Sequence, residues 1–459
     1  MSSVYDQVMK KYPYPVQFFK FCTPFESIPP QPCQANYFKT GYAARLIHSV
    51  LRKSGFKEVQ DLEDANVIVG GKLSNENLEC EYLTQRTNHY ENTFALGSKA
   101  GYHHIMRELE QRIHEIPSFY PETYLLPEER GKLLEAFPSS PLWIQKPAGG
   151  SRGNGISVID EPPNPSIKRV VVQKYLDHPL LINGLKFDLR FYVLVTSLVP
   201  LRIYAFDNGL VRLATEPYEE NHDSITNKSA HLTNFSINKE NENFHVTNDL
   251  AEDGKGNKWS HHPFWPWLKE QGFDCDEIRS KIEDAFVTCI MASRETFRQQ
   301  PRLRESFELF GFDVILSKEG DIHILEVNVS PALGTSSNLD MAIKAPLVKD
   351  LLNVALIPQP TETANFIEEK MLKRDDEDIC AAVSICEYEI AQKRLGGFRC
   401  IYPTPERVTK LKKYMEHTEP EDLALEKWIT SNDTEKTEYL TGLLQHFNEA
   451  VKNSKEGSN

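Results

Sequence analysis

Three oxygen-bearing side chains lie close together in the sequence pattern and could bind a metal ion. Glu326 and Asn328 stand two residues apart in DIHILEVNVSPAL (321–333), so on a strand their side chains point the same way. Asp313 lies in the preceding apolar segment ELFGFDVILS, and the turn SKEGD predicts a hairpin that brings Asp313 opposite them. Two carboxylates and an amide oxygen suit Mg²⁺ that also holds phosphates, whereas without a cation the carboxylates would repel. The alternative for an isolated ExN is a polar strand end entering a loop.

A glycine-rich segment, WIQKPAGGSRGNGISVI (143–159), could bind phosphate groups. It reads as a strand, a loop with four glycines and a second strand. Glycines adopt positive φ and let backbone N–H groups close on an anion, and Lys146 at the end of the first strand suits the α- and β-phosphates of a nucleotide. The segment matches neither GxxxxGK[ST] nor GxGxxG, and it leads into a strand, so a helix dipole is not involved. A flexible hairpin turn is the alternative.

The next segment, VVVQKYLDHPLLINGLKFDLRFYVLV (170–195), adds polar groups to apolar strands. Residues 173–176 are predicted to form the rim of an adenine pocket through backbone hydrogen bonds. Lys186, Asp188 and Arg190 alternate onto one strand face, where buried charges cost free energy unless they are paired or used. A structural ion pair is the alternative. Further polar residues downstream are weak signals individually: Arg212, Thr233, Asn234 and Ser236.

The surrounding pattern predicts an α/β (α+β) fold. Residues 35–71 read as strand, helix and strand, and HHIMRELEQRI (103–113) reads as a helix. Strands dominate residues 143–352, interrupted by one long amphipathic helix with apolar residues at spacing four, and the tail from about residue 360 is charged and helical in pattern. We expect four parts: an N-terminal α/β domain (1–72), a central linking domain (73–140), a catalytic domain (141–358) and a helical, charged extension (359–459).

Composition limits the class of protein. The 459 residues, 40% hydrophobic and 10% aromatic, predict a globular protein with room for about three domains. The net charge of −14 argues against nucleic-acid binding and requires a local basic patch for any acidic partner. The eight cysteines show no CxxC pair, which fits reduced thiols in the cytosol. No signal peptide is expected, and the most apolar region, 191–206, reads as two strands rather than a membrane span.

The order of these motifs resembles that of the ATP-grasp fold. Their amino-acid sequences resemble those of the glutamate ligases of the tubulin tyrosine ligase-like family. The matching phrases include WIQKPAGGSRGNGI, VVQKYLDHPLLINGLKFDLRFYVLVTS, HLTNFSINK, NKW, FELFGFDVIL and LEVNVSPALGTSSNLDMAIKAPLVKDLLN. They extend over residues 143–354. Residues 1–140 match more loosely, through RTNHYENTFALGSKAGYHHIMREL, and RLGGFRCIYP resembles the family's segment after the catalytic domain.

The resemblance implies roles for individual residues. ATP would contact Lys146, Arg152, Gly153, Gln173, Lys174, Tyr175, Leu176, Lys186, Phe187, Asp188, Thr233 and Asn234. Magnesium would be held by Asp313, Glu326 and Asn328, and the expected catalytic set is Lys146, Arg152, Arg190 and Glu326. The substrate residues would be Arg152, Arg212, Phe235, Ser236, Lys258 and Lys344. Phe235 replaces the tyrosine usual in the family's HLTNYS, which removes one hydroxyl from the amino-acid site.

The implied activity is an ATP-dependent ligase that joins free L-glutamate to the γ-carboxylate of acceptor glutamates. The expected partners are tubulin or microtubules, through their acidic C-terminal tails, or other acidic proteins. A monomer is expected, in the cytoplasm on the cytoskeleton, cilia or basal bodies. Arg152 and Val329 resemble members that add the first glutamate, whereas elongating members tend to carry Gln and His there. A ligase for tyrosine or glycine and a nucleotide-binding scaffold without catalysis are the alternatives.

Overall fold

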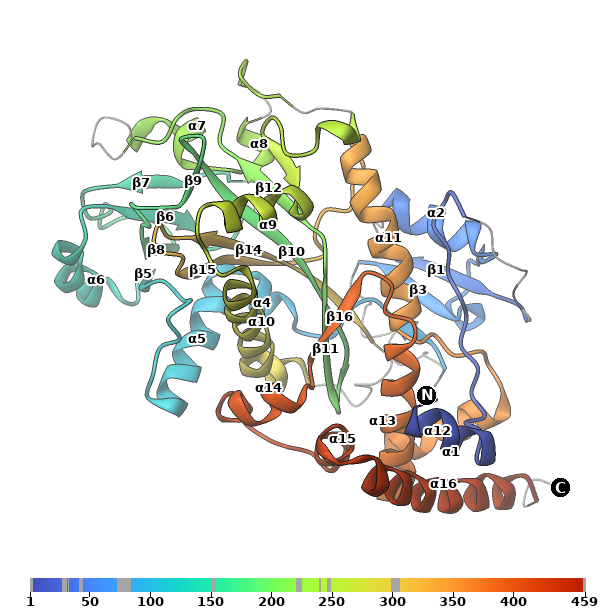
Figure 1. The fold of residues 1–459 in the computed structure, drawn as a ribbon. Helices are drawn as coiled ribbons and strands as arrows, with labels where there is room; N and C mark the ends of the chain where they lie inside the picture. Colours follow the sequence, from blue (N-terminus) through green and yellow to red (C-terminus); the bar gives the residue numbers. More distant parts are fainter. Residues whose placement is uncertain are drawn as a thin grey trace.

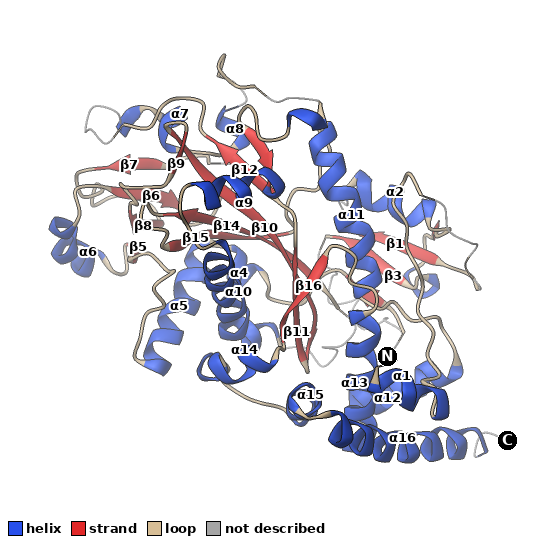
Figure 2. Cartoon of the chain, viewed as in Figure 1, coloured by secondary structure: helices blue, strands red, loops and turns tan. Residues whose placement is uncertain are grey.

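The largest β-sheet of the computed structural model is built around one long strand, β10 (Leu185–Leu198). The structure describes residues 3–26, 31, 33–40, 44–71, 84–150, 153–219, 225–238, 241–245, 249–298 and 306–456. β10 pairs antiparallel with β12 (Leu210–Leu213) and β11 (Leu201–Phe206) along one edge and with β14 (Glu308–Leu316) along the other. Nearly every residue of β10 is buried, because helices and loops cover both faces (Figure 2).

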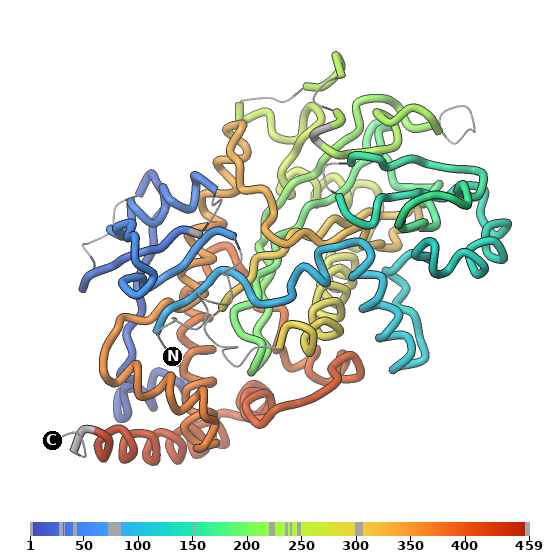
Figure 3. The backbone as a smooth tube through the Cα atoms, turned by 180° about the vertical axis from the view of Figure 1, so that it is seen from behind, coloured from blue at the N-terminus to red at the C-terminus, as the bar shows by residue number. Residues whose placement is uncertain are grey.

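The hairpin predicted from the sequence is present at one edge of this sheet. β15 (Ile322–Val329) pairs antiparallel with β14, with Asp313 opposite Glu326 and Gly311 opposite Asn328. The register shifts between Asp313 and Val314, and such irregularities re-aim side chains at sheet edges and sites. The helices α4 (Phe94–Gly97) and α5 (Lys99–Ile113) pack against β15. Figure 3 shows this segment running from the N-terminal region across the back of the molecule.

A second sheet contains the glycine-rich hairpin. Its order is β5–β8–β6–β7, and β6 (Trp143–Pro147) pairs antiparallel with β7 (Ser157–Ile159), as the sequence predicts. β8 (Val170–Lys174) and β5 (Thr123–Leu126) complete the sheet, which α6 (Arg130–Ala136) flanks at one side of the molecule (Figure 1). Trp143 is fully buried against Phe137, so the start of β6 is fixed by the core of this sheet.

The N-terminal residues form a third, smaller sheet. β1 (Asn36–Thr40), α2 (Arg45–Lys53) and β3 (Val67–Gly70) follow the predicted order of strand, helix and strand. β1 pairs parallel with β3 and with β2 (Lys57–Glu58), and β3 pairs parallel with β4 (Arg86–Thr87). α2 packs against α11 (Asn338–Val354), a long helix that follows the β14–β15 hairpin (Figure 1).

Three elements differ from the sequence predictions. The tail is not only helical, because β16 (Phe398–Tyr402) pairs with β11 and extends the main sheet. Between residues 143 and 352, α9 (His261–Glu270) and α11 accompany the single predicted helix, α10 (Cys275–Phe297). Prolines inside α9 and α11 weaken their helical pattern in the sequence. The division into four domains stays a prediction.

The remaining helices and strands extend or cover these sheets. They are α1 (Val4–Lys11), β4 (Arg86–Thr87), β9 (Leu181–Ile182), α7 (Lys228–His231), α8 (Phe235–Asn238), β13 (Lys258–Ser260), α12 (Glu362–Lys373), α13 (Glu377–Gln392), α14 (Pro405–Lys410), α15 (Pro420–Thr430) and α16 (Asp433–Glu456). α1 packs against α16, so the two ends of the described chain meet (Figure 1). Within the described residues, no helix is both long enough and apolar enough to span a membrane.

Candidate active site

Charged side chains from three strands meet on one face of the main sheet. The Arg190 guanidinium contacts both carboxylate oxygens of Asp313, with Nε 2.5 Å from Oδ1. Arg212 contacts Asp188 in the same two-pronged way and also lies 2.9 Å from Asp313. The hydroxyl of Thr233 donates a hydrogen bond to Asp188. The ion pairs that the sequence left as an alternative are therefore present, between neighbouring strands rather than along one strand.

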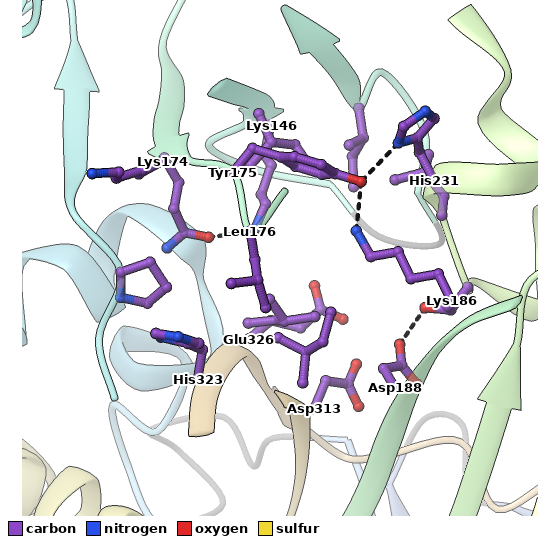
Figure 4. Close-up of a pocket in the computed structure, with 18 of the residues that line it drawn as sticks. Lys146, Lys174, Tyr175, Leu176, Lys186, Asp188, His231, Asp313, His323 and Glu326 are labelled. Carbon is purple, nitrogen blue, oxygen red and sulfur yellow. Dashed lines mark hydrogen bonds between the residues drawn. The ribbon is translucent and has the colours of Figure 1, made fainter. Parts of the chain in front are cut away.

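A cavity of about 450 Å³ lies between the main sheet and the glycine-rich sheet. Its walls come from β6 and β8 on one side and from β10, β14 and β15 on the other. Figure 4 shows side chains of both sheets pointing into it. It brings together eleven of the predicted site residues: Lys146, Gln173, Lys174, Tyr175, Leu176, Lys186, Asp188, Thr233, Asn234, Asp313 and Glu326. We call it the first cavity.

Two buried lysines enter the first cavity with neutral hydrogen-bond partners. Lys146 donates to the side-chain oxygen of Gln173 at 2.7 Å, and Lys186 donates to the Tyr175 hydroxyl at 2.6 Å. Among the described residues, neither ammonium has a carboxylate within ion-pair distance. Burial lowers the pKa of Lys146 to about 8 and that of Lys186 to about 7. A bound anion would restore both charges.

The three predicted magnesium ligands lie close together, and two of them, Asp313 and Glu326, line the first cavity. The Asn328 amide nitrogen lies 3.2 Å from a Glu326 oxygen and 3.4 Å from an Asp313 oxygen. It thus lies between the two carboxylates, and turning the amide about its last bond presents oxygen there instead. Burial alone would raise the pKa of Asp313, but Arg190 and Arg212 outweigh burial and hold it well below its usual range. The donor set therefore fits a divalent cation that replaces the amide N–H contacts.

The residues expected to hold a free amino acid are already paired. Lys258 and Lys344 each place their ammonium 2.7 Å from Asp340, which is buried. Burial would raise the pKa of Asp340, but the two lysines outweigh it and lower the pKa to about 2. Arg212 lies beside Lys258 in the register of β12 and β13. The sequence interpretation missed Asp340, which cancels one of the positive charges.

A second cavity of about 690 Å³ adjoins the first and shares Asn234 and Glu326 with it. Arg190, Arg212 and Asn328 line the same end. We call it the second cavity. The shared wall means that a group bound in one cavity can meet a group bound in the other beside the predicted metal ligands.

His89, which the sequence did not single out, lines the second cavity and joins three parts of the chain. Its Nδ1 lies 2.9 Å from Glu308, and its Nε2 lies 2.8 Å from the carbonyl oxygen of Gly70 and 3.2 Å from the Ser330 hydroxyl. Burial alone would lower the pKa of His89, but Glu308 outweighs it and raises the pKa. His89 thus ties the end of β15 to the N-terminal sheet.

Several other predicted site residues do not line the first cavity or lie outside the residues that the structure describes. The Phe187 side chain packs in the core against Phe264 and Trp267, so only its backbone could serve a ligand in the first cavity. Gly153 closely approaches Asn234, because a Cβ on Gly153 would lie 3.0 Å from the Asn234 oxygen. Arg152 lies outside the described residues, and the side chains of Phe235 and Ser236 are not described.

Apolar residues of the first cavity were also missed, although the sequence carried a signal for them. Ile144 stands two residues from Lys146, and Ile315 stands two residues from Asp313, so strand alternation places each pair on one face. Leu325 and His323 line the same cavity from β15. An apolar lining around a few polar groups is typical of a small-molecule site.

The chain belongs to the tubulin-tyrosine ligase family, whose model matches residues 76–365. A Caenorhabditis elegans protein named tubulin polyglutamylase ttll-4 is 32% identical over 410 residues, which cover 79% of this chain and 66% of the relative. Mouse tubulin monoglutamylase TTLL4 is 39% identical over 280 residues, covering 59% of this chain and 23% of the relative. Mouse tubulin polyglutamylase TTLL5 is 35% identical over 325 residues, covering 68% and 24%. The predicted family and its glutamate-ligase branch are thereby confirmed, and the chain spans from about a quarter to two thirds of these relatives' lengths.

Proposed function

We propose that this protein is an ATP-dependent ligase that joins the α-amine of L-glutamate to the γ-carboxylate of a glutamate in an acidic protein. The observation that carries the proposal is the shared wall of the two cavities. Two buried lysines, which have no carboxylate partner among the described residues, face Asp313 and Glu326 in the first cavity, and Glu326 also lines the second. One cavity thus suits a polyphosphate, and the other suits the groups to be joined beside it.

ATP is proposed to bind between the two sheets, in the manner of an ATP-grasp enzyme. Lys146 and Lys186 would contact its phosphates, and the glycine-rich loop would close over them. The backbone of residues 174–176 would hold the adenine, and Thr233 and Asn234 line the same cavity. Asp313, Glu326 and Asn328 would hold Mg²⁺, which neutralises phosphate charge when it is bound.

The reaction then needs two nucleophilic attacks at the shared wall. An oxygen of the acceptor γ-carboxylate attacks the γ-phosphorus of ATP, so ADP leaves and an acyl phosphate forms. The deprotonated α-amine of L-glutamate attacks the acyl carbon, the carbon–oxygen bond to phosphate breaks, and the amine loses a proton as the isopeptide bond forms. Arg190 and Arg212 line the second cavity beside this point and can stabilise the developing negative charge. Their contacts with Asp313 and Asp188 fix their orientation.

Glutamate is the proposed donor because it carries two carboxylates. Arg212, Lys258 and Lys344 supply three positive charges, of which Asp340 cancels one. Arg212 is also paired with Asp188 and Asp313, so it would share its guanidinium between them and one carboxylate of glutamate, while the remaining lysine charge meets the other carboxylate. The names of the relatives, which are tubulin polyglutamylases and monoglutamylases, support the same choice.

Tubulin is the proposed acceptor, with cytoskeletal association following from it. We also propose that the enzyme adds the first, branching glutamate. Val329 lines the second cavity and offers no hydrogen-bond donor to an existing chain, although it also packs against Gly97 of α4. A pair of peptides, one unmodified and one with a single branch glutamate, tests this proposal. Preference for the branched peptide, unaltered by Arg152→Gln with Val329→His, would overturn it.

A competition assay tests the donor. The enzyme is incubated with Mg-ATP, purified tubulin and radiolabelled glutamate, and unlabelled glutamate, tyrosine or glycine is added in excess. Only unlabelled glutamate is expected to reduce incorporation. Incorporation that tyrosine or glycine suppresses equally would assign the enzyme to another reaction of the family, and Mg-ATP binding without any transfer would favour a non-catalytic scaffold.

A further inference from the structure

The second cavity has two chemically different ends. Its charged end, at Arg190, Arg212 and Glu326, adjoins the first cavity. The other end is apolar, and its lining residues come partly from the N-terminal sheet and from α11, which are neighbours in Figure 1. Its lining comes from α2, β3, β14, the segment after β15, and α11: Ala44, Ile47, Val69, Phe307, Leu309, Leu333, Val348, Leu351 and Leu352.

Neither small substrate of the proposed reaction matches the apolar end. L-glutamate carries charges at both ends of a short chain, and the triphosphate belongs to the first cavity. Apolar surface left in water costs about 25 cal/mol per Å², so an apolar recess that opens beside a charged site favours an apolar occupant. The acceptor is the one reactant that can carry apolar and acidic groups together.

We propose that the apolar end binds an aliphatic or aromatic side chain of the acceptor peptide, close in sequence to the modified glutamate. This inference rests on the proposed function and specifies its acceptor: an acidic segment interrupted by an apolar residue. The acceptor glutamate lies at the charged end, and the neighbouring apolar side chain enters between α2 and α11.

The strand geometry sets the spacing between the two acceptor residues. Leu309 lines the apolar end of the second cavity, Asp313 lines the adjoining first cavity, and both belong to β14. Four residues of strand span about 13 Å, at about 3.3 Å per residue. An extended peptide advances by a similar length, and the two side chains themselves take up part of it. The apolar residue is therefore expected about two to four positions from the glutamate.

Charge around the second cavity is compatible with an acidic peptide. Glu308 lines this cavity, but its carboxylate is paired with His89 and shielded from solvent, so the pair carries little net charge. Arg190 and Arg212 lie at the charged end, where the peptide's carboxylates would be close. The peptide's carboxylates would thus meet two arginines that are paired with Asp313 and Asp188 at the site of reaction, and its apolar residue would meet the apolar surface beyond them.

The test compares acceptor peptides that differ at one position. Each peptide contains a single glutamate among aspartates and serines, and a leucine replaces a serine at each position up to four residues away on either side. Glutamate transfer is followed by mass spectrometry with intact enzyme, Mg-ATP and L-glutamate. A leucine at the favoured position is expected to lower the peptide KM about tenfold, in line with partial burial of a leucine side chain.

Two enzyme variants locate the effect in the second cavity. Ile47→Asn places a polar group on α2 in the apolar end, and Ala332→Phe fills the cavity from an exposed position after β15. Both are expected to remove the leucine preference while the serine peptide keeps its KM. The matched control, Leu134→Asn, changes an exposed leucine of α6 outside the cavity and is expected to retain the preference. Melting temperatures show that each variant is folded.

The outcomes separate this inference from the proposed function. Equal transfer to all peptides, or a leucine preference that survives in folded Ile47→Asn and Ala332→Phe, would overturn the apolar contact while leaving the ligase activity established. Binding of detergent or of a second enzyme molecule at the apolar end would also overturn the inference. It would be seen as inhibition of glutamate transfer that is the same for every peptide. Failure to transfer glutamate to any peptide or to tubulin would instead overturn the proposed function.

Discussion

The two cavities hold their positive charges in opposite ways. In the first cavity, Lys146 and Lys186 donate to neutral oxygens, and burial lowers the pKa of each. In the second, Arg190 and Arg212 contact the carboxylates of Asp313 and Asp188, and these carboxylates raise the pKa of both arginines although burial opposes them. The lysines thus have neutral partners and can bind an anion, whereas the arginines are already paired with carboxylates.

This difference predicts different roles for the two cavities. A cation without a partner is costly to bury, so its binding of a phosphate recovers the cost of desolvation. A paired arginine has a fixed orientation and responds to new charge only in part. We therefore expect substitutions in the first cavity to affect ligand binding and substitutions in the second to affect both stability and the chemical step. Glu326, which lines both, should affect the reaction most.

The largest effect is expected for Glu326→Gln. The substitution keeps the shape but removes a formal charge from the predicted magnesium site, and few other groups there could replace it. We expect glutamate transfer to fall at least about 100-fold with an unchanged melting temperature. Glu128→Gln, an exposed carboxylate of the same length outside both cavities, is the control. Normal turnover in folded Glu326→Gln would refute the metal assignment.

Arg190→Gln tests the pairing in the second cavity. It leaves the buried Asp313 with Arg212 as its remaining cationic partner, so the free energy of unfolding should fall by about 3 kcal/mol. The pKa of Asp313 is lowered in the folded protein, so its contribution to stability is present at neutral pH and is lost as the pH falls below the usual carboxylate range. Denaturant unfolding at pH 7 and at acidic pH measures both effects. A variant as stable as the wild type at pH 7 would show that Arg212 alone satisfies Asp313.

Lys146→Ala tests the opposite behaviour in the first cavity. Removing a buried cation that lacks a carboxylate partner should leave stability nearly unchanged, while the KM for ATP rises roughly 10- to 100-fold and kcat changes less. Steady-state kinetics with ATP and glutamate varied separately distinguishes the two substrates. If the KM for ATP were unchanged and the affinity for glutamate fell sharply, the proposed role of Lys146 in ATP binding would be wrong.

The smallest expected effect is a pH dependence of ATP binding. Free Lys146 and Lys186 have pKa values of about 8 and about 7, and a bound triphosphate raises both. Binding therefore takes up protons above pH 7, and affinity should fall as the pH rises from 7 to 9, by up to about tenfold from the Lys146 charge alone. Calorimetry in buffers of different ionisation enthalpy detects the proton uptake. In the unliganded protein, both lysines have lower pKa values in the folded state than in the unfolded state. The unfolded state therefore binds more protons than the folded state between pH 7 and pH 9, and the free energy of unfolding rises with pH in this range.

How much the sequence predicted differs between the two cavities. The first depends on local patterns: Lys146 ends a strand before glycines, and Asp313, Glu326 and Asn328 follow the alternation of a hairpin, so their convergence could be predicted. The family itself was also predicted correctly. The second cavity depends on side chains far apart in the chain, such as His89 with Glu308, and no local period encodes such pairs.

β16 and α11 show the same limit in the fold. β16 is a short strand in a helical region, and only its pairing with β11 reveals it. α11 contains Pro346, which weakens the helical signal, although its packing against α2 stabilises the helix. Tertiary contacts overrode local preference in both elements.

One measurement tests most directly the claim that the two cavities together ligate glutamate to an acidic protein. Wild-type enzyme and Glu326→Gln are incubated with Mg-ATP, L-glutamate and purified tubulin, and the products are analysed by peptide mass spectrometry with fragmentation. We predict the added mass of single glutamate residues on glutamate side chains of the acidic tails, with ATP converted to ADP and phosphate, and no addition by the variant. Added mass at a chain terminus, addition of another amino acid, or equal modification by Glu326→Gln would contradict the claim.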